Sequence, residues 1–212
     1  MIKLENTEVS GWQAAIRGMR NPMNSWDKSD SGYRPVVEPP CGDVALRFVV
    51  GENDFDLMRR LVRAGSDHSK FMRMINVTVD VTAPTYLAAE MDTYKVGTVR
   101  NSCSFMHKGV SSPFTINDFS VHGFPTYIDR IYDDIIDALN RLREEYLETK
   151  DEKVFQQIRC LLPSGYNQRY TWQANYAVLR NIYHSRKNHR LEEWHTFCHW
   201  IESLPYSELI TL

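Results

Sequence analysis

Two polar residues near the C-terminal end of the chain could line a binding pocket. Asn175 and Arg186 are eleven residues apart. If a helix begins near Tyr170, that spacing places both within about 20° of each other on one face. The same face carries three apolar residues at helical spacing: Val178, Leu179 and Ile182. An amide and a guanidinium on a buried face need partners, because desolvating them unpaired costs free energy. The pattern indicates either a polar pocket or subunit junction, or a helix whose Asn caps a neighbour and whose Arg reaches solvent.

The end of this predicted helix is strongly basic, reading His184-Ser185-Arg186-Lys187-Asn188-His189-Arg190. Cations at a helix end can hold a phosphate, with arginine supplying a two-pronged donor. The same cations can equally serve only to balance the helix dipole. Because the basic stretch is short and the chain carries a net charge of −2, nucleic acid is not expected as a partner.

Other reactive residue types form weaker patterns. His195 and His199 are four residues apart on a predicted helix, but no third ligand follows at metal-binding spacing, so an ordinary helix face is expected and no metal. His68 stands at a predicted helix-to-strand junction, where loops often meet ligands. The cysteines are scattered and predict reduced thiols in a cytosolic protein: Cys41, Cys103, Cys160 and Cys198.

Composition predicts an ordinary soluble protein. The chain has 212 residues, of which 42% are hydrophobic and 25% charged, enough for one sizeable core. No apolar run approaches the ~20 residues that span a bilayer. The first residues carry charges where a signal peptide would be apolar. We therefore expect a cytoplasmic protein with no membrane partner.

Hydrophobic periodicity predicts the elements that must position these residues. We expect strands at 1–7, 43–50 and 75–82, helices at 11–19, 55–64, 85–95, 128–149, 151–162, 170–186 and 191–204, and long loops at 21–41 and 96–124. The fold class that follows is α+β, in a single domain over residues 1–212. It would have a small mixed or antiparallel sheet in the N-terminal half and a helical C-terminal half.

Residues 159–186 resemble the C-terminal signature of the flavin-dependent thymidylate synthases, also called thymidylate synthase-complementing proteins. Five positions stand in one register with that signature: Arg159, Pro163, Asn175, Asn181 and Arg186. The likeness extends more thinly over about residues 55 to 205. The strand at 75–81 resembles the one leading into the family's flavin motif, and His68 matches a His at its flavin and folate site.

The resemblance implies a specific reaction. The family makes dTMP from dUMP, taking carbon from methylenetetrahydrofolate and hydride from FAD that NADPH has reduced. It uses no covalent enzyme nucleophile, and it works as a homotetramer with active sites at subunit junctions. The fold would be that of the family.

The resemblance also implies roles for individual residues. Arg159 would hold the dUMP phosphate. Arg186 would contact the uracil ring and act in catalysis by stabilising negative charge on it. The remaining substrate positions would be Cys103 and Ser104. The cofactor positions would be His68, Lys95, Asn175, Asn181 and Arg190.

The family's second signature, RHRxxSxNExSxR, aligns with residues 93–105 and is altered here. Lys95 keeps one charge of the RHR triplet, Cys103 stands at the expected Ser, and Phe105 stands at the phosphate-binding Arg. Arg100 and Asn101 match one residue out of register. His107 and Lys108 offer displaced charge.

Three functions are therefore compatible with the sequence. The first is a flavin-dependent thymidylate synthase. The second is a catalytically silent nucleotide-binding or assembly homologue, and the third a variant pyrimidine-nucleotide one-carbon transferase. A cation that restores the ligand contacts of segment 93–105 favours an enzyme, whereas apolar packing of that segment favours the silent homologue.

Overall fold

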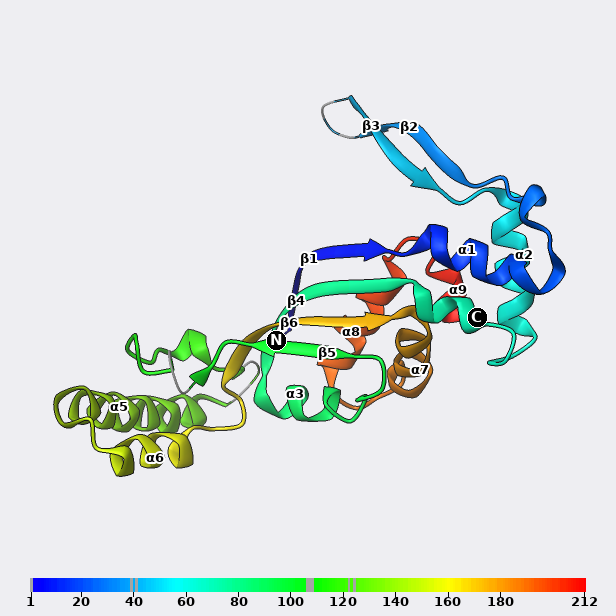
Figure 1. Cartoon of the computed structure of the whole chain (residues 1–212). Coiled ribbons are helices and arrows are strands. Elements are labelled where there is room, and N and C mark those ends of the chain that lie inside the picture. Colours follow the sequence, from blue (N-terminus) through cyan, green and yellow to red (C-terminus); the bar gives the residue numbers. More distant parts are fainter. Residues whose placement is uncertain (1, 39, 41, 106–108, 122, 124) are drawn as a thin grey trace. The chain divides into compact units, whose positions relative to one another are not determined.

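The computed structural model describes residues 2–38, 40, 42–105, 109–121, 123 and 125–212 (Figure 1). Its strands are β1 (Lys3–Ser10), β2 (Gly32–Glu38), β3 (Asp43–Val49), β4 (Asn76–Pro84), β5 (Val99–Ser102) and β6 (Asn167–Asn175). Its α-helices are α1 (Trp12–Arg20), α2 (Glu52–Arg63), α3 (Thr85–Met91), α5 (Thr126–Thr149), α6 (Glu152–Leu161), α7 (Tyr176–Arg186), α8 (Glu192–Glu202) and α9 (Glu208–Thr211). Short 3₁₀ helices are η1 (Asn21–Met23), η2 (Trp26–Lys28), η3 (Lys70–Met74) and η4 (Ile116–Asp118).

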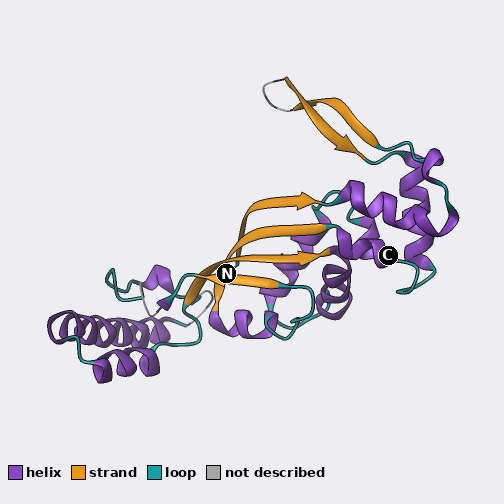
Figure 2. Cartoon of the chain, in the orientation of Figure 1, coloured by secondary structure: helices purple, strands orange, loops and turns teal. Residues whose placement is uncertain are grey.

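The strands form two small sheets (Figure 2). The larger has the order β1-β4-β6-β5, and the smaller is the antiparallel β2–β3 hairpin. β4 alternates half-buried and buried residues along its length, as period-2 patterning predicts for a strand with one buried face. The expected α+β class is confirmed.

The chain divides into two compact units. One contains Met1–Glu5, Asp80–Thr93 and Arg100–Trp172, and the other contains Asn6–Val79, Tyr94–Val99 and Gln173–Leu212. The division falls within strands of the larger sheet. Below we call them the α5 unit and the α7 unit, after a helix of each.

An aromatic cluster forms the core of the α5 unit. α5 packs against α6, as their amphipathic spacing predicts. The buried side chains of this core are Val110, Phe114, Phe119, Leu139, Phe155 and Ile158.

The core of the α7 unit forms where α7 packs against α8, α9 and η3. It also contains a buried ion pair, in which Arg20 Nε donates to Asp54 Oδ1 at 2.6 Å. Burial raises the pKa of Asp54, but hydrogen bonds from two serines and from Arg20 outweigh it and hold the pKa below its usual value. The carboxylate is therefore charged and fully paired, which a buried acid requires.

The predicted helix at 170–186 is wrong in its first part. Residues up to Asn175 form β6, and α7 begins only at Tyr176. Tyr170, Trp172 and Ala174 are buried while the residues between them are exposed, which is strand alternation. The apolar residues of β6 continue the helical spacing of α7, so the sequence pattern did not separate the two elements. The C-terminal half, predicted to be helical, therefore also contains a strand.

The predicted loops contain further elements. The segment at 21–41 holds η1, η2 and β2. β2 forms by pairing with β3, and it can contain Pro35 because it is an edge strand. The segment at 96–124 holds β5 and η4. The helix predicted at 85–95 ends at Met91. The short helix α9 was not predicted. The expected boundaries at Met1, Cys41 and Phe124 lie outside the described residues.

Candidate functional site

Arg186 is held between two aromatic rings at the end of α7. Its Nε donates to the Tyr94 hydroxyl at 2.9 Å, and its Cζ lies 5.6 Å from the Tyr94 ring centroid and 4.8 Å from that of Trp194. Trp194, on α8, is fully buried. Cation–π contact and a hydrogen bond fix a planar guanidinium better than either does alone. Arg186 is therefore a half-buried, oriented cation.

Asn175 caps the other end of the same helix. Its side-chain oxygen accepts a hydrogen bond from Val178 N at 3.1 Å, as expected of Asn at an N-cap. Asn175 and Arg186 therefore lie at opposite ends of α7. The prediction that both share one helical stripe is wrong, because the residue at the cap has extended backbone angles.

The segment Tyr94–Val99 lies along α7 and contacts both ends of it. At its start, the Tyr94 side chain meets Arg186. Gly97 has a φ of +80°, and a Cβ there would lie 2.9 Å from Asn175 Nδ2. The turn between them is closed by Thr98 Oγ1, which donates to the Tyr94 carbonyl at 2.6 Å. Asn175 and Arg186, at opposite ends of α7, therefore both contact the segment Tyr94–Val99.

The other predicted cofactor residues belong to the same unit and are exposed to solvent. His68 lies in the turn after α2, Lys95 in the segment along α7, Asn181 on α7, and Arg190 in the turn after it. Three of these four side chains are basic or can become so. They are accessible to an anionic ligand.

The predicted substrate residues Arg159, Cys103 and Ser104 belong to the α5 unit. Arg159 is exposed in the last turn of α6. Cys103 is also exposed, and its backbone N donates to the Arg169 carbonyl at 2.9 Å. Ser104 is half-buried.

Phe105 joins the aromatic core of the α5 unit. Its ring centroid lies 5.8 Å from that of Tyr166 and 6.0 Å from that of Phe155. Nearby in the sequence, Arg100 pairs with Asp92 at 2.9 Å. The phosphate-binding position of the second signature is thus filled by a core side chain. His107 and Lys108 lie outside the described residues.

Sequence reasoning missed Tyr94 and Trp194. Tyr94 stands at the histidine of the RHR triplet, so alignment to the signature could have drawn attention to it. Trp194 is eight residues beyond Arg186 on the next helix, and no spacing rule connects the two.

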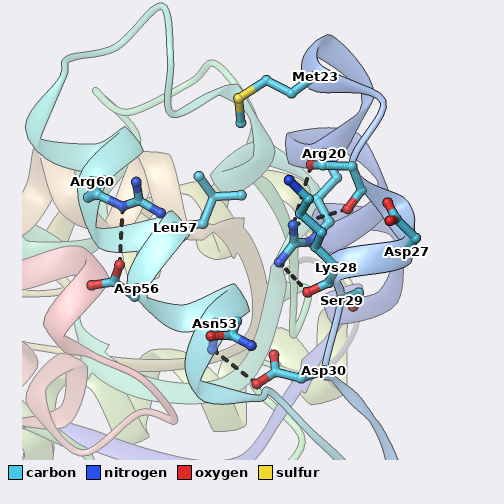
Figure 3. Close-up of a pocket in the computed structure, with 11 residues that line it drawn as sticks. Arg20, Met23, Asp27, Lys28, Ser29, Asp30, Asn53, Asp56, Leu57 and Arg60 are labelled. Carbon is cyan, nitrogen blue, oxygen red and sulfur yellow. Dashed lines mark hydrogen bonds and ion pairs between the residues drawn. The ribbon is translucent and has the colours of Figure 1, made fainter.

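A large hollow in the α7 unit, of about 730 Å³, is polar but internally paired (Figure 3). Arg20 is bonded to Asp54 and to the Ser25 and Lys28 carbonyls. Asp30 accepts from the backbone N of Asn53 at the start of α2, and Asp56 pairs with Arg60 at 3.1 Å. These groups of the lining therefore satisfy one another.

Thiol and metal chemistry find little support in the α7 unit. Burial raises the pKa of Cys198 to about 11, so this free thiol stays protonated at neutral pH. Across the part of the chain that the structure describes, no group of three His, Cys, Asp or Glu side chains is placed to hold a metal ion. Nor does any described helix combine the length and apolarity needed to cross a membrane.

Comparisons with known proteins point to one family. The model of a family described as thymidylate synthase complementing protein matches residues 21–202. The chain is similar in fold to the flavin-dependent thymidylate synthase ThyX from Helicobacter pylori complexed with FAD and dUMP. That match has a TM-score of 0.70 and 14% identity, and it covers 99% of this chain and 98% of that one. No curated protein matches the chain in sequence.

Two further solved structures are similar. A second ThyX structure from Helicobacter pylori, with FAD and dUMP, has a TM-score of 0.68 and 13% identity, and each chain is covered over 100% of its length. A UMP/dUMP methylase, PolB from Streptomyces cacaoi, bound with 5-Br dUMP, has a TM-score of 0.61 and 17% identity, covering 100% of this chain and 94% of that one. At such identities the likeness establishes the fold.

Proposed function

Because the chain belongs to the thymidylate synthase complementing protein family, the flavin-dependent thymidylate synthases, we propose that it converts dUMP to dTMP. Methylenetetrahydrofolate would supply the carbon and NADPH the reducing equivalents. FAD, when bound, supplies hydride transfer. The protein would act in the cytoplasm as a single-domain subunit of a homotetramer.

The observation that carries this proposal is the fixed guanidinium of Arg186. Tyr94 and Trp194 hold it in place. A donor that is oriented before the ligand arrives stabilises developing negative charge without reorganising during the reaction. We assign Arg186 to the pyrimidine ring of dUMP, as its position in the family signature implies.

The remaining residues supply binding. In the α7 unit, the accessible side chains of His68, Lys95, Asn181 and Arg190 suit an anionic dinucleotide such as FAD. Asn175 would border the flavin while capping α7. In the α5 unit, Arg159 would take the dUMP phosphate, with Cys103 and Ser104 beside it. Phe105 cannot bind phosphate, so Arg159 would carry more of that charge than in a chain with the complete signature.

A variant pyrimidine-nucleotide methyl transfer is the second candidate. It is favoured by the fold likeness to a UMP/dUMP methylase and by the altered positions Cys103 and Phe105. A silent nucleotide-binding homologue is the third, because the apolar packing of Phe105 removes a cation from the second signature.

One set of measurements separates these candidates. The purified chain is titrated with FAD and followed by its flavin absorption, and then assayed for methylated product with dUMP and with UMP. We expect a bound-flavin spectrum and dTMP from dUMP. Faster turnover of UMP would favour the variant methylase. Binding of dUMP without flavin would favour the silent homologue. Protein that stays colourless at excess FAD, with no dUMP-induced thermal shift, would contradict all three.

A further inference from the structure

The β2–β3 hairpin has one wholly apolar face. Directly paired residues of an antiparallel ladder share a face, and the faces alternate along each strand. The register therefore places six apolar residues together, here called the apolar strip: Tyr33, Pro35, Val37, Val44, Leu46 and Phe48. The opposite face includes Arg34, Arg47 and Asp43. The hairpin is thus amphipathic, although none of the described residues of its own unit covers most of the apolar strip.

The apolar strip is largely open to solvent. Val37, Val44 and Leu46 are 65%, 67% and 66% exposed, and Tyr33 is 59% exposed. Figure 1 draws the hairpin as a two-stranded ribbon that leaves the helices α1 and α2 of its unit. These four residues alone expose about 500 Å² per copy, within the size range of the largest patch on a typical monomer, which is often a functional surface. Because an isolated two-stranded hairpin is marginally stable in water, a covering surface would stabilise it.

At the base of the hairpin the apolar strip continues into a hollow of about 520 Å³. The hairpin contributes Tyr33, Leu46 and Phe48 to its lining. The body of the α7 unit contributes Trp12, Trp200, Leu204, Pro205 and Tyr206, among others. A projecting apolar ribbon and an apolar hollow therefore lie side by side on one unit.

We propose that the apolar strip is the contact surface for a second copy of this chain. Two hairpins would pack face to face about a two-fold axis. Val37 and Val44 lie four residues beyond Tyr33 and Phe48 along their strands, a distance of about 14 Å. Antiparallel packing therefore brings Val37 and Val44 of one copy over the hollow of the other, and the same contact is made twice.

Area and charge favour this occupant. Two apolar strips packed together remove about 1,000 Å² from water, and the paired hollows add to it, which reaches the range of a specific interface. Arg34 and Asp43 lie on the outer face of the hairpin, whereas Arg47 lies on that face and also lines the hollow, so the contact covers few ionic groups. The proposal rests on the proposed homotetramer but not on the proposed reaction, and it names the surface through which two copies associate.

Sedimentation of the full-length chain at several concentrations tests the proposal. Leu46→Lys places a charge in the apolar strip, and Val36→Lys makes the same change at an exposed residue of the opposite face. We expect Leu46→Lys to raise the dissociation constant between copies at least about tenfold, and Val36→Lys to behave as the wild type. Circular dichroism of both variants should match the wild type, because both sites are exposed.

Three outcomes would overturn the proposal. One is a wild-type chain that is monomeric at every concentration. Another is a Leu46→Lys variant that associates as strongly as the wild type. The third is a wild-type monomer that sediments with phosphatidylcholine vesicles, which would assign the apolar strip to a lipid surface. Sedimentation measures the mass of the assembly and not turnover. The test therefore decides the proposal even for a chain that lacks thymidylate synthase activity.

Discussion

The segments Tyr94–Val99 and Arg100–Phe105 follow one another in the chain but belong to different compact units. The first lies along α7, where its Tyr94 side chain meets Arg186 and its Gly97 meets Asn175. The second ends in the aromatic core of the α5 unit, where Phe105 packs against Tyr166. Together they occupy the positions of one family signature, so one motif has changed in two different ways.

The difference lies in what each substitution keeps. At Tyr94 the side chain has changed but still supplies a hydrogen-bond acceptor to the cation of α7. Phe105 stands where the signature has a phosphate-binding Arg, and its ring packs against the aromatic core instead. Tyr94 therefore makes a polar contact with Arg186, whereas Phe105 packs in an aromatic core. Substitutions at four positions test this contrast, and the largest expected effect comes first.

Arg186→Ala should abolish most of the catalytic activity and leave the fold intact. We expect kcat/KM for dUMP to fall about 100-fold or more, roughly 3 kcal/mol of transition-state stabilisation, with little change in melting temperature. Steady-state kinetics and thermal denaturation measure the two effects. Arg17→Ala, at an exposed arginine of α1, is the matched control and should change neither. Normal dUMP binding by Arg186→Ala would show that Arg186 is only a structural residue.

Phe105→Ala should act in the opposite way. It removes a half-buried ring from an aromatic core, which we expect to lower the free energy of unfolding by about 2 kcal/mol. Denaturant titration gives this value. Because Phe105 has no ligand role here, kcat/KM of the folded fraction should stay near the wild-type value. A stable variant with impaired turnover would reverse the roles assigned to the two segments.

Asn175 has a cap role and a proposed flavin role, and two variants separate them. Asn175→Ala should cost about 1 kcal/mol of stability, whereas Asn175→Ser keeps a capping oxygen and should cost only a few tenths. If Asn175 also borders the flavin, both variants should weaken FAD binding alike in an absorption titration. Normal FAD affinity in the serine variant would leave Asn175 with the cap role alone.

Tyr94→Phe is the smallest change. The ring remains over Arg186 but the hydrogen bond to Nε is lost, so we expect about a fivefold fall in kcat/KM, near 1 kcal/mol. Tyr127→Phe, at an exposed tyrosine of α5, is the control and should leave kcat/KM unchanged. Equal effects from the two variants would mean that the Tyr94 hydroxyl does not position Arg186.

The sequence was most informative where one period holds throughout an element. The alternation of residues 75–82 and the amphipathic spacing of residues 128–149 both correspond to observed elements, β4 and α5. It failed at Tyr170, because apolar residues of a strand can continue the spacing of the helix that follows. It also failed at β2, a strand that pairs with β3 in a two-stranded sheet and whose exposed residues include Pro35.

The candidate site shows the same division. Arg186 and Asn175 could be selected from the chain because their types and positions match a signature. Trp194 could not, since its contact with Arg186 depends on how α8 packs against α7. Local patterns identify which side chains can do chemistry, whereas tertiary packing decides which neighbours orient them.

The order of strands has a consequence for how the chain is made. β4 lies between β1 and β6, and its Asp80 meets Arg169 of β6 across 89 residues. At a synthesis rate of about 5–20 residues per second, β6 leaves the ribosome roughly 4–18 s after β4. Through that interval the edge of β4 has no β6 to pair with, while the α5–α6 pair can already close through local contacts. We therefore expect the nascent chain to need chaperone protection most at a strand whose two edges are both paired in the finished protein.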